Sequence, residues 1–155
     1  MTRPTPIQPR DLWEKDGSLR DVYVRDTTFT DWALFLSLAG KYGYRYSYEG
    51  QNRLLPEVEK IFTARDGAHL LSVELGRVTA NCHFFVPDEI ELDLDPREIQ
   101  SDADHYQVLQ FLEALSEGMN KMVSVTAENA QDMPYLSYDP LSREWAVYEP
   151  PAFPQ

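Results

Sequence analysis

The stretch AHLLSVELGRVTANCHFFVPDEIELDLDPREI, residues 68–99, decides the fold. Apolar and polar residues alternate on both sides of Gly76 and Arg77, a pattern that predicts two antiparallel strands joined by a two-residue turn. Leu71 then lies opposite Cys82 on an apolar side, and the other side is polar. Because a shift of one residue would exchange the two sides, the alternation fixes the register.

A third strand is predicted in DEIELDLD, residues 88–95, where Glu and Asp alternate with Ile and Leu. A three-residue loop over 86–88 puts the aliphatic residues on the apolar side, whereas a two-residue loop would bury the carboxylates at a high cost in free energy. The pairs predicted across this loop are Phe84 with Ile90, Cys82 with Leu92, His83 with Glu91, and Asn81 with Asp93. The three strands form a central meander, about residues 68–95, with one open and acidic face.

The rest of the chain supplies helices and further strands. Apolar residues recur at helical spacing over 28–43, over 56–65, and in a longer helix that Asp102 or Asp104 caps. The first of these helices begins at a capping box of Thr28 and Asp31. Further strands are predicted over about 21–26, 44–48 and 122–126, then a loop over 127–134 and a hairpin within 135–150 that turns at 139–142. This order predicts an α+β fold, with helices packed on one face of a mostly antiparallel sheet.

Length and composition favour one globular domain. With 155 residues, 43% of them hydrophobic, the chain can bury a core of its own. We expect a proline-rich N-terminal arm over residues 1–17, the α+β domain over 18–149 and a C-terminal tail over 150–155. No apolar run approaches the ~20 residues of a membrane span, and the N-terminus lacks an apolar signal region, so a cytoplasmic protein is expected.

The net charge of −12 bears on the choice of partners. Nucleic acids and anionic membranes are bound by basic surfaces, so neither is an expected partner. A basic protein partner fits the charge, and so does solubility alone. The acidic run between Asp88 and Asp104 lacks the calcium-loop pattern, although carboxylates two apart on a strand could hold Mg²⁺ or Ca²⁺ weakly. No metal site and no cofactor is predicted.

Candidate catalytic groups are few. Cys82 and His83 are adjacent, but neighbouring strand residues point to opposite faces and cannot act together as nucleophile and base. His69 and His83 are also expected on opposite faces, which excludes joint ligation of zinc within one sheet. His83 beside Glu91 is the better local pair, either as an exposed surface pair or as an acid–base pair in a cleft.

Several phrases of the sequence carry a resemblance to a known class of protein. They are NCHFF (81–85), DEIELDLDPREI (88–99), DVYVRDTT (21–28), TAEN (126–129) and YLSYDP (135–140). Over about Asp21 to Pro140 the chain resembles small bacterial proteins of the immunity type, which belong to interbacterial toxin systems. The resemblance implies a small, acidic, cytoplasmic α+β protein that binds and blocks a cognate toxin, and it assigns no role to any single residue.

Three functions are compatible with these observations. The first is an immunity protein that occludes a basic toxin domain through its acidic surface. The second is a small-ligand-binding protein or enzyme that uses a cleft at His83 and Glu91, and the third is a structural subunit of a homo-oligomer. For the first function, the residues expected to contact the partner are Glu74, His83, Glu91, Asp93 and Asp95, with Tyr46 and Trp145 as aromatic anchors.

Overall fold

The computed structural model describes residues 9, 11–64 and 66–148; the predicted tail and residues 1–8 and 10 of the predicted arm lie outside them. Within the described residues, nine strands form one sheet in the order β3-β2-β4-β5-β6-β1-β7-β8-β9, and each strand is antiparallel to its neighbours. The strands are β1 (Arg20–Arg25), β2 (Tyr44–Tyr48), β3 (Gln51–Asn52), β4 (His69–Leu75), β5 (Val78–Cys82), β6 (Glu89–Leu94), β7 (Val123–Ala127), β8 (Ala130–Asp139) and β9 (Glu144–Val147). The α-helices are α1 (Phe29–Tyr42), α2 (Val58–Thr63) and α3 (Asp102–Met119), and a 3₁₀ turn, η1, covers Pro96–Glu98. The α+β class with a mostly antiparallel sheet is therefore confirmed.

Strands β4, β5 and β6 are neighbours in the chain and in the sheet. β4 and β5 pair in the register that places Leu71 opposite Cys82. The pairing of β5 with β6 is shorter and ends where Cys82 lies opposite Leu92. The predicted pair of Phe84 with Ile90 is wrong, because β5 ends at Cys82 and the positive φ of Phe84, 56°, turns the chain out of the strand.

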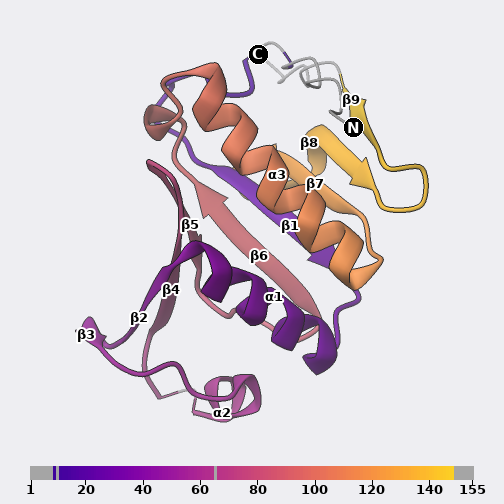
Figure 1. The fold of residues 1–155 in the computed structure, drawn as a ribbon. Coiled ribbons are helices and arrows are strands. Elements are labelled where there is room, and N and C mark those ends of the chain that lie inside the picture. The colour runs from indigo at the N-terminus through magenta and orange to yellow at the C-terminus, as the bar shows by residue number, and fades with distance from the viewer. Residues whose placement is uncertain (1–8, 10, 65, 149–155) are drawn as a thin grey trace.

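One face of the sheet is covered by α1 and α3, which lie next to each other (Figure 1). The predicted capping box of Thr28 and Asp31 begins α1, and its two reciprocal hydrogen bonds satisfy backbone groups at the helix end. For α3, neither Asp102 nor Asp104 is the cap. Ser101 takes this place, because its hydroxyl accepts a hydrogen bond from the amide of Asp104 at 3.2 Å.

The core lies between these helices and the sheet. Trp32 and Phe35 of α1 and Phe111 of α3 are fully buried, and Trp32 stacks on Phe84 with 5.4 Å between the ring centroids. Such aromatic contacts add stability beyond the area that they bury. Among the residues that the structure describes, no helix combines the length and the hydrophobicity that a membrane crossing requires.

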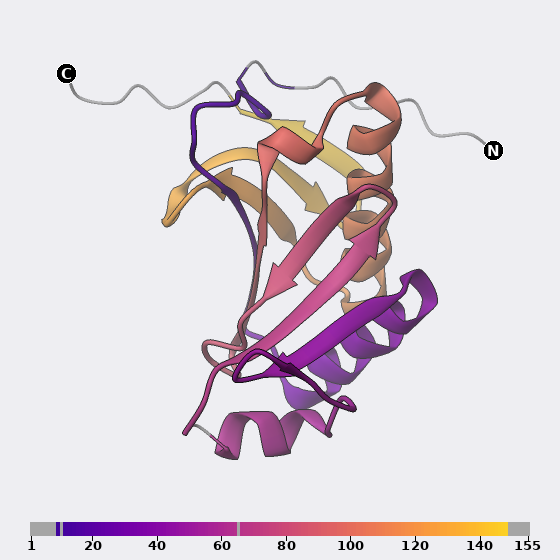
Figure 2. The ribbon, with the colours of Figure 1, turned by 90° about the vertical axis from the view of Figure 1, so that its left-hand side faces the viewer.

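Strand β1 lies in the middle of the sheet, between β6 and β7. Beyond it, the β7–β8 hairpin curves out on the side of the sheet that faces away from α1 and α3 (Figure 2). The pairing of β7 with β8 shifts register between Val125 and Ala127, and such bulges bend a strand. The loop predicted over 127–134 is too long, because β8 already begins at Ala130. Pro134 lies within β8, where the irregular pairing accommodates a proline.

Part of the predicted N-terminal arm packs on the domain. Leu12 is fully buried, and Trp13 donates a hydrogen bond from its indole nitrogen to Nδ1 of His105 at 2.9 Å. The buried guanidinium of Arg20 donates to the carbonyl oxygen of Leu12 at 2.6 Å and to that of Asp11 at 3.1 Å. These bonds tie the segment from Asp11 onward to the start of β1.

Candidate functional site

A row of polar side chains crosses four strands on the face that α1 and α3 leave uncovered. The register places Asp21 of β1 opposite Asp93 of β6, Asp93 opposite Asn81 of β5, and Asn81 opposite Ser72 of β4. Asn81 links the row, because it accepts a hydrogen bond from the hydroxyl of Ser72 at 2.8 Å and donates one to Asp93 at 3.2 Å. The Asp93 carboxylate is thereby held in one orientation.

His83 lies beside this row, but its partner differs from the predicted one. Nε2 of His83 is 3.2 Å from Oδ2 of Asp93, so the predicted pair with Glu91 is wrong. The pairing of β5 with β6 ends one residue before His83, and its ring therefore reaches back to the carboxylate opposite Asn81. When protonated, the imidazolium of His83 forms an ion pair with Asp93.

Asp21 is the buried member of the row, with 5% of its surface exposed. Its carboxylate accepts hydrogen bonds from the Tyr23 hydroxyl at 3.1 Å and from the backbone amide of Asn129 at 2.7 Å. Burial raises the pKa of Asp21 above its ordinary value, and the nearby charges of Asp93 and Glu128 act in the same direction. Asp21 was not among the predicted site residues; it becomes a candidate because β1 lies next to β6.

Tyr23 follows Asp21 on the same face of β1. Burial raises the pKa of its hydroxyl far above the ordinary value, and the carboxylates of Glu91 and Asp21 that this hydroxyl bonds raise it further. Tyr23 therefore stays neutral at any physiological pH, and its hydroxyl donates a hydrogen bond to a carboxylate. It orders the acidic residues and is unsuited to act as a base.

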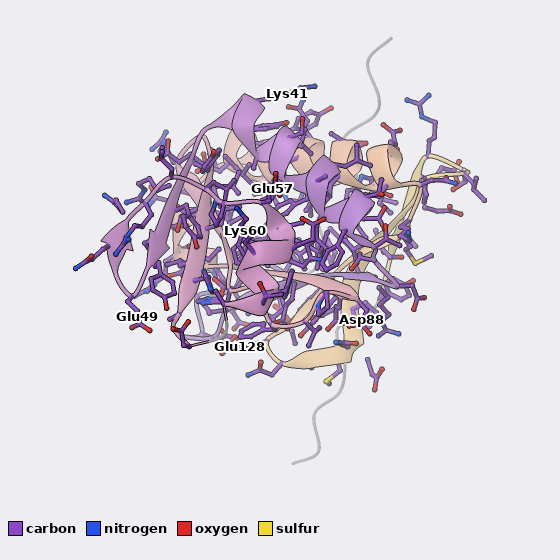
Figure 3. All side chains as sticks on the ribbon, turned by 90° about the horizontal axis from the view of Figure 1, so that it is seen from below. Lys41, Glu49, Glu57, Lys60, Asp88 and Glu128 are labelled. Atoms are coloured by element: carbon purple, nitrogen blue, oxygen red, sulfur yellow. The ribbon has the colours of Figure 1, made fainter. Side chains whose placement is uncertain are left out.

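The curved β7–β8 hairpin closes a small cavity over this row, which we call the Asp93 cavity. Its lining side chains come from β6, from β1 and the residue before it, from the loop after β5 and from the turn of the hairpin: Leu19, Asp21, His83, Phe85, Glu91, Leu92, Asp93, Glu128 and Asn129. Glu128, labelled in Figure 3, lies in the turn of the hairpin and accepts a hydrogen bond from the amide of Leu19 at 2.7 Å. The volume, about 120 Å³, is well below the roughly 300–1,000 Å³ of typical small-molecule sites.

Phe85 forms an apolar wall of the Asp93 cavity. Its ring is 54% exposed and stacks on His83, with 5.4 Å between the ring centroids and 21° between the planes. The turn at Phe84 produces this arrangement, because it sends Phe84 into the core and Phe85 to the outside. The predicted position of Phe84 on the apolar side already implied that Phe85 faces outward, but alternation alone did not predict the stack of Phe85 on His83.

Two of the predicted acidic residues lie outside the cavity and have their own cations. Glu74, 53% exposed, forms an ion pair with Arg45 at 3.7 Å. Asp95 caps η1 and is 2.7 Å from Arg97, whose hydrogen bonds lower the pKa of Asp95 below its ordinary value. Both remain at the surface, but part of their charge is offset locally.

The two predicted aromatic anchors are on the other side of the sheet from the Asp93 cavity or in the core. Tyr46 is 5% exposed, and its hydroxyl lies 2.6 Å from Nδ1 of His69. It therefore cannot be an exposed anchor, because it lies opposite Leu71 on the apolar face. Trp145 lies opposite Tyr138, whose hydroxyl donates to Glu117 of α3, so Trp145 is half-buried on the helix side.

The groups considered for covalent or metal chemistry are separated in the structure. Cys82 is completely buried, and burial raises the pKa of its thiol to about 12, which leaves almost no thiolate near neutral pH. His69 bonds Tyr46, His83 bonds Asp93 and His105 bonds Trp13. In the described part of the chain, no three His, Cys, Asp or Glu side chains are grouped so that they could hold a metal ion.

No protein-family model matches this chain, and no curated protein or solved structure is significantly similar to it.

Proposed function

We propose that this is a binding protein of the immunity type, which neutralises a basic bacterial toxin by covering it. The docking face is the side of β4, β5, β6 and β1 that faces away from α1 and α3. The observation that carries the proposal is the row of carboxylates on this face, Asp21, Glu91 and Asp93, in a chain with a net charge of −12. A basic partner would be attracted to this face before contact.

The weak local compensation of these charges supports the proposal. Across the described residues, no lysine or arginine forms an ion pair with Asp21, Glu91 or Asp93, whereas Glu74 and Asp95 each have an arginine. Neighbouring like charges on one sheet face destabilise it. A cationic partner would reduce this repulsion. Part of the binding free energy would therefore come from relief of the repulsion between carboxylates in the free protein.

The small volume of the Asp93 cavity favours a docking function over the alternative of an enzyme or small-ligand protein. A site of about 120 Å³ cannot enclose most of a substrate of ordinary size. His83 and Asp93 would still influence binding, since a protonated His83 adds positive charge to a face that must attract a cation.

Two features of this proposal come from the class of protein alone. An immunity protein that meets its toxin inside the producing cell is expected in the cytoplasm. It is also expected to bind as a preformed surface, because a rigid sheet face loses little conformational entropy on binding. A homo-oligomeric subunit is the remaining alternative, and light scattering on the purified protein would distinguish it.

The test begins with capture of the partner from the native host by tagged protein. The captured partner is then bound to the double variant Glu91→Lys/Asp93→Lys, with Glu57→Lys/Glu59→Lys at the N-terminal end of α2 as the matched control. We expect the first variant to lower the association rate about tenfold or more at low salt and to flatten its salt dependence. The control variant should stay within about twofold.

Thermal melting of both variants shows that they are folded before binding is compared. Equal association rates for the wild type and for Glu91→Lys/Asp93→Lys, at every salt concentration, would refute the electrostatic docking face. Capture of no basic protein, together with a dimer or larger assembly in light scattering, would favour the homo-oligomer instead.

A further inference from the structure

We infer that the Asp93 cavity receives one arginine side chain from the basic partner. This inference rests on the proposed function and names the group that the docking face recognises. The cavity, the carboxylates around it and the exposed ring of Phe85 each carry part of the argument.

The first part concerns size and shape. The cavity measures about 120 Å³ and opens between the β7–β8 hairpin and the end of β5. This space suits one extended side chain better than a free metabolite, which needs roughly 300 Å³ or more. A side chain presented by a folded partner also brings the rest of the interface with it, so the cavity alone need not supply the affinity.

The second part concerns charge. Carboxylates face the cavity from two directions, with Glu91 and Asp93 on the sheet and Glu128 on the hairpin. Asp21 lies beneath them, and burial and its acidic neighbours raise its pKa. Each carboxylate has about four acceptor positions, so the hydrogen bonds already made to Asp93 by Asn81 and His83 leave room for further donors. The occupant that complements these groups is a cation with several N–H donors.

The third part distinguishes arginine from lysine. Phe85 presents its ring beside the carboxylates, half exposed and held by its stack on His83. A guanidinium is planar, so it can lie on an aromatic ring and donate in its plane to two carboxylates at once. An ammonium is a compact, strongly hydrated charge that gains less from such a ring. A mixed aromatic and acidic wall is therefore better matched by arginine.

The test uses a defined probe and does not need the natural partner. The probe is the blocked tripeptide acetyl-Gly-Arg-Gly-amide, with two counterparts that carry lysine or the uncharged isostere citrulline. Binding to the full chain is followed by ¹H–¹⁵N NMR. We expect the arginine peptide to shift the amide signals of His83, Phe85 and Asn129 in a saturable way, with a Kd on the order of millimolar. Lysine should bind about threefold more weakly, and citrulline should not bind.

Three variants assign the binding to the cavity. Glu91→Gln/Glu128→Gln keeps one acceptor oxygen in each side chain but removes two charges, and we expect it to weaken binding of the arginine peptide about fivefold. Glu57→Gln/Glu59→Gln removes the same charge at the N-terminal end of α2 and should leave the affinity within about twofold. Phe85→Leu keeps an apolar side chain without the ring. It should lower the affinity for the arginine peptide about threefold and have less effect on the affinity for the lysine peptide.

The outcomes separate this inference from the proposed function. Equal shifts with arginine and citrulline peptides, or no saturable shifts at His83, Phe85 and Asn129, would overturn the inference. If the Glu91→Lys/Asp93→Lys variant nevertheless failed to bind a basic partner that the wild type binds, the proposed function would survive the failure of the inference. Specific arginine binding together with no toxin partner would support the cavity assignment and remove the immunity function.

Discussion

The buried guanidinium of Arg20 provides the sharpest test of how the N-terminal segment is attached. Arg20 is 1% exposed and donates hydrogen bonds to carbonyl oxygens of Leu12 and Asp11 on one side. It also lies 3.6 Å from the Asp16 carboxylate and 5.3 Å from the centre of the Tyr135 ring. Replacement by methionine keeps an apolar stem of similar length and removes every donor.

We expect Arg20→Met to lower the free energy of unfolding by about 3 kcal/mol. Loss of a charged partner from a buried network costs roughly 3–5 kcal/mol, and hydration of the exposed end of the segment offsets some of this. For a chain of this length, about 2–4 °C of Tm is lost per kcal/mol, so the melting temperature should fall by about 6–12 °C. Urea titration with a shared m value gives the free-energy difference directly.

The control is Arg45→Met, the same substitution at an arginine whose side chain is 66% exposed and pairs with Glu74. Exposed ion pairs contribute little, so this variant should change stability by less than about 0.5 kcal/mol. A loss below about 1 kcal/mol for Arg20→Met would refute the conclusion that its hydrogen bonds hold the segment at Asp11 and Leu12.

Two further predictions concern the buried acid and the end of α1. Because burial raises the folded-state pKa of Asp21, its charge costs stability above that pKa, and the cost disappears as the pH falls toward the ordinary value of 3.8. The variant Asp21→Asn should therefore be more stable than the wild type at pH 7 and lose this advantage near pH 4. Urea titration at both pH values measures the difference. An advantage that stayed constant with pH would contradict this cause. Gly43→Ala should destabilise the protein by about 1–2 kcal/mol, because Gly43 has a φ of 105°. Gly40 lies inside α1 with no atom within 4 Å of an added Cβ, so Gly40→Ala should stabilise the protein by about 0.5–1 kcal/mol. Equal changes in Tm for the two variants in thermal melts would be inconsistent with the described backbone.

Local patterns in the sequence were sufficient to predict much of the fold. The alternation around Gly76 and Arg77 predicted that Leu71 lies opposite Cys82, and this pair is found. The capping box at Thr28 and Asp31 was also predicted from residues three apart. In both cases the interacting residues are close in the chain, so the pattern itself contains the geometry.

Predictions failed where a single backbone angle or a distant neighbour decides the structure. Phe84 adopts a left-handed conformation that few residues favour, so the loop after β5 differs from the expected one and His83 bonds Asp93. Asp21 was missed because nothing in the sequence says that β1 pairs with β6, some 70 residues later. Tyr46 was misassigned for the same reason, since its burial follows from pairing with Leu71.

The central place of β1 has a consequence for how the chain folds during synthesis. Of the strands in the described residues, β1 is synthesised first, yet its two neighbours, β6 and β7, are the sixth and seventh of the nine, at residues 89–94 and 123–127. Such long-range pairings slow folding, because loop entropy is lost before the contacts form. Until translation has passed β7, the nascent chain has no complete place for its first strand, and a chaperone that shields Val22 and Val24 would be of most use in that interval.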